Sequence, residues 1–85
     1  MPTTEDLHEP IDVLTAFENG AVRPVKFRWN GRVVPVERVA YQWITRDGAH
    51  PVRHFAVLAP GGTAYEIALH THTLRWTLLS VQMEG

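Results

Sequence analysis

Residues 25–44, which read VKFRWNGRVVPVERVAYQWI, constrain the fold of this chain more than any other stretch. The dipeptide Asn30-Gly31 separates two apolar runs, and both of its residues tolerate the positive φ angles of a type I′ turn. In front of this turn, apolar and basic residues alternate with the two-residue period of a β-strand. They are Val25, Lys26, Phe27, Arg28 and Trp29. The stretch therefore predicts a β-hairpin with its turn at Asn30-Gly31.

The return run of this hairpin does not keep a regular alternation. Val34 and Val36 share one face of an extended strand, whereas Tyr41 and Trp43 fall on the other face. A β-bulge between the two pairs, near Glu37, restores the register and bends the strand, as a small barrel requires. We therefore predict a single bulged strand that runs from the turn to residue 44.

Four further segments are predicted to be strands, because apolar residues alternate in them and turn residues such as Gly and Pro border them. They are residues 11–17, 53–59, 63–70 and 74–81. In the first segment a helical spacing competes with the alternation, and its β-branched residues favour the strand. The sequence thus predicts an all-β fold, a small antiparallel meander of five to six strands curled into an SH3-like barrel or a small sandwich. We expect Trp29 and Trp76 to lie in its core.

Eighty-five residues suffice for one domain with a single core. Residues 1–9 are polar and acidic and show no periodicity, so we expect a disordered tail in front of a domain over residues 10–85. Charge is distributed unevenly, because five acids and no Lys or Arg precede Arg23, whereas eight basic residues and four acids follow from there. This asymmetry is typical either of a body that binds polyanions or of an ordinary solvated surface.

Cysteine is absent from the sequence, which excludes disulfides, thiolate metal sites and a Cys nucleophile. No apolar run approaches the ~18 residues that a membrane span needs, and residues 1–10 show no signal-peptide pattern. We therefore expect a cytoplasmic protein without membrane contact.

Two groups of residues resemble a known sequence pattern. The first is FRWNGR at 27–32, followed by VERV at 36–39 and Trp43, and the second is YEIAL at 65–69 with Trp76. Together they resemble a small bacterial family of unknown function, found as stand-alone proteins and near the end of non-catalytic mutasome proteins related to Y-family translesion polymerases. The resemblance covers residues 10–81 and implies an accessory role near DNA repair. The family carries no established catalytic residues, and this chain departs from the family's pattern at 70–73, where it reads HTHT.

Aromatic and basic residues interleave along the chain, and a subset of them forms the candidate binding surface. The subset is Arg32, Arg38, Trp43, Arg46 and Arg53. Aromatic rings beside guanidinium groups hold single-stranded nucleic acids by stacking and by charge, and exposed aromatic grooves of small barrels bind peptides. Because it lies at a strand end, Trp43 is the aromatic residue that we expect to be exposed.

The histidines at 70 and 72 are weak candidates for metal ligands, because alternate residues of a strand share one face. Zinc needs a third and usually a fourth ligand, and the sequence has no compact motif that supplies them. We therefore predict no metal site and no cofactor.

Catalytic side chains show no recognisable arrangement either. Ser80 is the only serine, and Glu37, Asp47 and Glu66 are scattered. We therefore predict no enzymatic activity and no small-molecule substrate. The sequence predicts instead an accessory module that binds a protein partner, and the resemblance implies a link to DNA repair or translesion synthesis. Direct binding of single-stranded nucleic acid and a structural homodimer are the alternatives.

Overall fold

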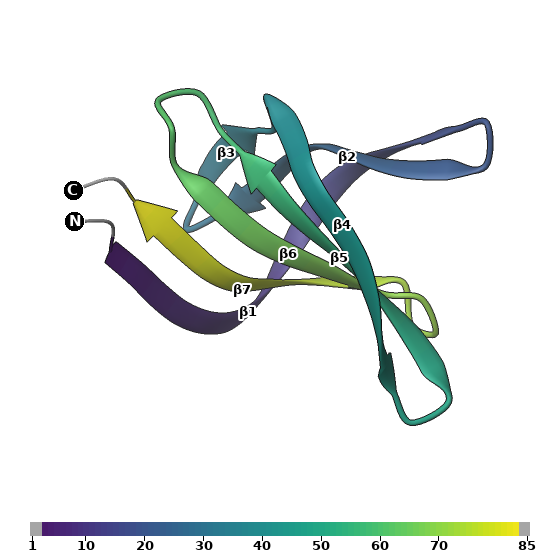
Figure 1. Cartoon of the computed structure of the whole chain (residues 1–85). Coiled ribbons are helices and arrows are strands. Elements are labelled where there is room, and N and C mark those ends of the chain that lie inside the picture. Colours follow the sequence, from purple (N-terminus) through teal and green to yellow (C-terminus); the bar gives the residue numbers. More distant parts are fainter. Residues whose placement is uncertain (1–2, 84–85) are drawn as a thin grey trace.

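A computed structural model describes residues 3–83, which form one antiparallel sheet of seven strands without a helix (Figure 1). The strands are β1 (Thr3–Glu18), β2 (Ala21–Trp29), β3 (Arg32–Pro35), β4 (Arg38–Asp47), β5 (His50–Leu58), β6 (Ala64–His70) and β7 (Arg75–Met83). Their order across the sheet is β3-β2-β1-β7-β6-β5-β4. The prediction of an all-β antiparallel fold is confirmed, with seven strands in place of the expected five to six.

Strands β3 and β4 follow each other in the chain and yet form the two opposite edges of the sheet. Only Val36 and Glu37 connect them, and a link of this length spans no more than about 10 Å. The Val36 N–H donates to the carbonyl of Val25 on β2 (2.9 Å), and the Glu37 N–H donates to the carbonyl of Leu58 on β5 (2.8 Å). The sheet therefore curls until its two edges meet at the link, although β3 and β4 do not pair with each other.

The single bulged strand predicted after the Asn30-Gly31 turn is therefore wrong. The change of face that suggested a bulge near Glu37 marks the passage of the chain from one edge of the sheet to the other. A true irregularity lies further on, between Val39 and Tyr41 of β4. Because a bulge shifts the side-chain alternation by one residue, it turns Tyr41 toward the outer face of the sheet.

The longest strand, β1, pairs with β7 through its first half and with β2 through its second half. The prediction of a disordered tail is wrong for residues 3–9, which pair with β7 from Thr3 opposite Met83 to Glu9 opposite Leu78. These pairings supply hydrogen-bond partners for backbone N–H and C=O groups of the segment. The polar composition of the segment gives no indication of this pairing. Residues 1 and 2 lie outside the part of the chain that the structure describes.

Two hairpin turns consist of an Asn-Gly pair in which both residues have positive φ angles. Asn30 and Gly31 both have positive φ angles, 52° and 72°, as a type I′ turn requires. Asn19 and Gly20 repeat this geometry between β1 and β2, with φ angles of 51° and 78°. The predicted hairpin at Asn30-Gly31 is confirmed as β2 and β3.

The core lies inside the curl of the sheet. Phe27 on β2 packs edge-on against Tyr65 on β6, with ring centroids 5.1 Å apart, and Trp29 packs against the same ring at 6.2 Å. Because β2 and β6 are not neighbours in the sheet, these contacts cross its interior. The half-buried indole of Trp29 donates from Nε1 to Glu9 Oε2 (3.0 Å). Trp76 is buried, as expected.

Truncation of Phe27 tests whether these contacts across the interior stabilise the curl. Phe27→Ala is expected to lower the free energy of unfolding by about 3–5 kcal/mol, because it empties a fully buried site. Phe17→Ala is the matched control, since Phe17 is 74% exposed, and its effect should stay within about 0.5 kcal/mol. Urea unfolding of both variants gives the two values. Equal losses would contradict the described core.

Candidate interaction surface on strand β4

Strand β4 forms a free edge of the sheet. It pairs with β5 alone, and the eight residues 40–47 are all exposed. Beyond the link, the hairpin of β4 and β5 projects from the rest of the sheet (Figure 1). A strand exposed on both faces and along one edge contributes little to the core, so its side chains are available for contacts with another molecule.

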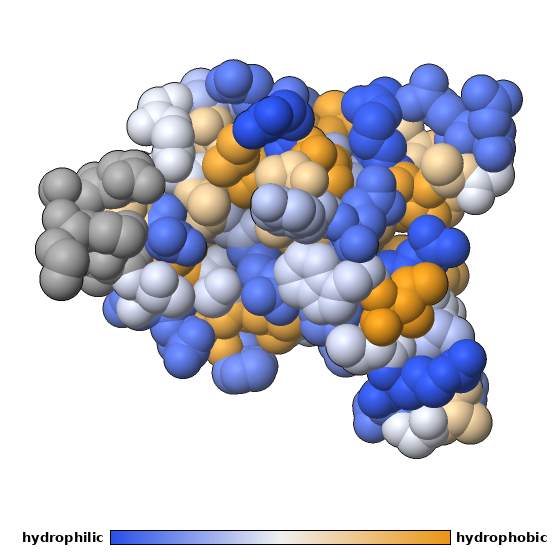
Figure 2. All heavy atoms as spheres, in the orientation of Figure 1, coloured by the Kyte–Doolittle hydropathy of each residue, from blue (hydrophilic) through white to orange (hydrophobic). Residues whose placement is uncertain are grey.

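Three large apolar side chains of β4 are exposed to solvent: Tyr41 (72%), Ile44 (58%) and Trp43 (39%). Figure 2 shows pale and orange side chains along the front of β4, flanked by hydrophilic ones. Scattered apolar side chains are normal on a surface, but here three of them lie within four residues of one edge strand.

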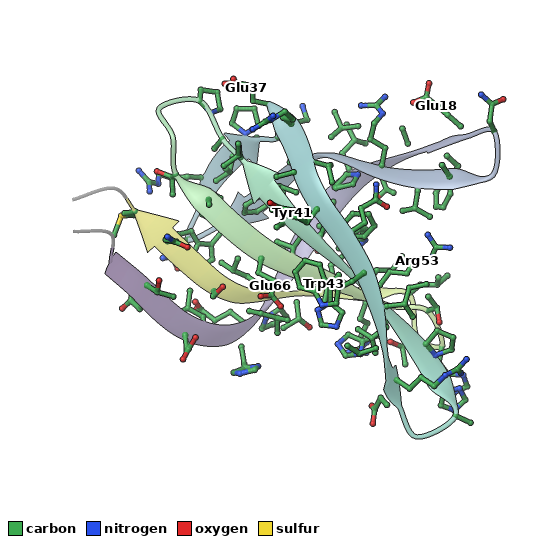
Figure 3. All side chains as sticks on the ribbon, viewed as in Figure 1. Glu18, Glu37, Tyr41, Trp43, Arg53 and Glu66 are labelled. Atoms are coloured by element: carbon green, nitrogen blue, oxygen red, sulfur yellow. The ribbon has the colours of Figure 1, made fainter. Side chains whose placement is uncertain are left out.

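The register with β5 decides which side chains share a face. Gln42 lies opposite the buried Phe55, and Ile44 lies opposite Arg53, so these residues belong to the inner side of the curl. Trp43 lies opposite His54 and faces outward. Figure 3 shows Trp43 and Arg53 directed to opposite sides of β4.

The predicted binding residues are therefore only partly brought together. Arg46 and Arg53 belong to the inner side of the β4–β5 hairpin, because Arg46 follows Ile44 by two residues. Trp43 lies on the other face, as does Arg38, whose partner in the register is Leu58. Arg32 begins β3 at the opposite edge of the sheet. The five residues thus form no single platform of aromatic and guanidinium groups.

Trp43 is held by residues that the sequence analysis missed. Its indole stacks on the imidazole of His54, with ring centroids 5.2 Å apart and planes inclined by 8°. His54 Nε2 lies 2.7 Å from Thr45 Oγ1, and His54 Nδ1 lies 3.2 Å from Glu66 Oε2. The network thus crosses β4, β5 and β6 on the outer face. The feature of the sequence that could have revealed this network is the two-residue loop Gly48-Ala49, because a loop of this length sets Trp43 opposite His54.

The hydrogen bonds define the proton positions in this network. An ionised carboxylate only accepts hydrogen bonds, so His54 Nδ1 carries the hydrogen and its N–H donates a hydrogen bond to Glu66. In the neutral imidazole Nε2 then has a lone pair, and the Thr45 hydroxyl donates to it. His54 is thereby held in one tautomer and one orientation.

The histidines considered as metal ligands lie at the end of β6 and in the turn that follows it. His72 stacks on His50, with ring centroids 3.9 Å apart, and His70 ends β6. Within residues 3–83, no group of three or more His, Cys, Asp or Glu side chains is arranged to hold a metal ion.

Comparison with protein-family models, with curated proteins and with solved structures finds no match to this chain. The resemblance to the small bacterial family stays a prediction. Among the described residues, no helix has the length and apolar character needed to cross a membrane.

Removal of the His54 ring tests the network around Trp43. His54→Ala is expected to lower the free energy of unfolding by about 1 kcal/mol, because one stacked ring pair and two hydrogen bonds are lost. The indole N–H resonance of Trp43 should shift at the same time. The control is His8→Ala, which replaces an exposed histidine on β1. Urea unfolding and NMR spectra that do not distinguish the two variants would contradict the network.

Proposed function

We propose that this protein is an interaction module that binds an extended segment of a partner protein along the free edge of β4. The segment would add a strand to the sheet through backbone hydrogen bonds, a common mode of peptide recognition. The observation that carries this proposal is the unequal protection of the two sheet edges.

Natural sheets protect their edges with short strands, charged side chains or proline. The β3 edge uses two of these devices, because it has four residues and ends at Pro35. The β4 edge has ten residues, and its charged side chains, Arg38, Arg46 and Asp47, lie at its two ends. Residues 40–45 between them have neither charge nor proline and include the three exposed apolar side chains described above. An edge left open in this way suits a partner strand.

The charges next to β4 indicate the chemistry of that partner. Arg38, Arg46 and Arg53 form no ion pair with another residue of the described range; its two ion pairs are Arg23–Glu18 and His54–Glu66. Two of these arginines, at 46 and 53, lie on the inner face of the hairpin, whereas Tyr41 and Trp43 lie on the outer face. The segment that fits best is therefore an extended one with acidic side chains on one face and apolar side chains on the other.

A second copy of the chain suits the edge less well. An antiparallel β4–β4 pair centred on Gln42 sets Tyr41 of one copy against Trp43 of the other, which is favourable. The bulge between Val39 and Tyr41 interrupts this register beyond Tyr41, so the regular part of such a pair is short.

Single-stranded nucleic acid is also less well supported, because base stacking on Trp43 and phosphate contacts with Arg46 and Arg53 would occur on opposite faces of the hairpin. A partner within a DNA-repair assembly is the first to test, in view of the resemblance to mutasome proteins.

An acidic model peptide tests the proposal directly. A fluorescent eight-residue peptide in which glutamate alternates with valine is expected to bind, and to bind more weakly as salt is raised. Arg46→Glu combined with Arg53→Glu should weaken binding at least about tenfold, which corresponds to about 1.4 kcal/mol. Arg75→Glu, an exposed arginine on β7, is the matched control and should leave binding unchanged. Fluorescence anisotropy gives the affinities.

Three outcomes would contradict the proposal. Equal losses in the double variant and in the control would show that net charge alone governs binding. Binding of single-stranded DNA without binding of the peptide would identify nucleic acid as the ligand. A light-scattering mass that doubles with concentration, with the peptide excluded, would identify a second copy as the occupant of the edge.

A further inference from the structure

Thr45, His54 and Glu66 form a row of three polar side chains across three adjacent strands on the outer face of the sheet. They connect a hydroxyl, an imidazole and a carboxylate through contacts of 2.7 Å and 3.2 Å. Figure 3 shows Glu66 close to Trp43 on this face, with β4 in front. The order of the three groups is that of a nucleophile, a general base and the residue that orients the base.

The proton positions derived above are those that a hydroxyl nucleophile needs. Glu66 accepts a hydrogen bond from His54 Nδ1–H, so His54 Nε2 is the basic atom, and it already accepts a hydrogen bond from the Thr45 hydroxyl. His54 is sheltered, with a side chain 12% exposed, whereas Glu66 is 32% exposed. Thr45 is exposed on the edge strand, so a reactant can reach its oxygen.

We propose that Thr45 is an acyl-accepting nucleophile that reacts with small esters. In this step Thr45 Oγ1 attacks the ester carbonyl carbon while its proton passes to His54 Nε2. The new Oγ1–acyl bond forms as the bond to the leaving alcohol breaks, and His54 returns the proton to that alcohol. Water, deprotonated by the same nitrogen, then releases the acid and restores Thr45.

Two features next to Thr45 suit this chemistry. Trp43 stacks on the His54 ring, which keeps the imidazole in one orientation and provides a partly exposed aromatic wall for an apolar acyl group. Because β4 is an edge strand, it also has backbone N–H groups that no neighbouring strand occupies. Such groups are the usual donors to the oxyanion of an acyl transfer.

This inference goes beyond the proposed interaction function and does not rest on it. Peptide binding depends on the edge of β4 and on Arg46 and Arg53, whereas acylation depends on the hydroxyl of Thr45. A variant without that hydroxyl is expected to bind the peptide normally, so failure of one proposal leaves the other in place.

The test uses the complete chain with p-nitrophenyl acetate, followed by mass spectrometry of the intact protein and of its peptides. One acetyl group is expected on Thr45. Thr45→Val, which keeps the shape of the side chain, should abolish acetylation at this position because it removes the attacking oxygen. His54→Phe, which keeps a ring against Trp43, and Glu66→Gln should each lower the acetylation rate about a hundredfold, the range of general-base catalysis. Thr15→Val is the control, because the Thr15 hydroxyl bonds only to a backbone carbonyl.

Glu66→Gln tests whether Glu66 acts on His54 during the reaction or only stabilises the fold. Gln keeps the size of the side chain but lacks the negative charge that stabilises the imidazolium formed during the attack. The proposal predicts slow acetylation by a folded protein, with a pH–rate profile displaced from that of the unaltered protein. Acetylation of Lys26 or the N-terminus alone, no acetylation at all, or a rate that Thr45→Val leaves unchanged would overturn it.

Discussion

The two-residue link of Val36 and Glu37 is the constraint on which the structure depends. It joins the opposite edges of a seven-stranded sheet, and its N–H groups bond to β2 on one side and to β5 on the other. A sheet with edges tied in this way has to curl, which brings β2 across from β6 and encloses Phe27 against Tyr65. The arrangement of the core therefore depends on the link as much as on the burial of apolar side chains.

The same link explains why one edge stays open. From this point the two edge strands run different distances, because β3 has four residues and β4 has ten. Most of β4 thus extends past the place where the edges meet, and among residues 3–83 it pairs with β5 alone. This part of the sheet carries exposed apolar side chains, the inner-side arginines Arg46 and Arg53, and on the outer side the Thr45–His54–Glu66 row that crosses from β4 to β6. Both proposals arise from this unequal length.

Local signals were predictable from the sequence, and pairing between distant segments was not. The Asn30-Gly31 turn and most strands follow from backbone chemistry and alternation within a few residues. Alternation alone could not tell a bulge from a change of edge near Glu37, because both shift the side-chain pattern by one residue. The order of residues 3–9 depends on β7, about seventy residues away in the chain. Trp43 was expected to be exposed and is, whereas His54 and Glu66 became relevant only through their cross-strand neighbours.

Amide hydrogen exchange along β4 tests the central claim, that its outer edge is open and takes a partner strand. In dilute protein, every second N–H among residues 40–47 should exchange rapidly, because only the intervening ones bond to β5. On addition of the acidic peptide, these rapidly exchanging groups should become protected, with little change in β6. Uniform protection of β4 in the dilute protein, or protection by the peptide elsewhere but not on β4, would contradict the account.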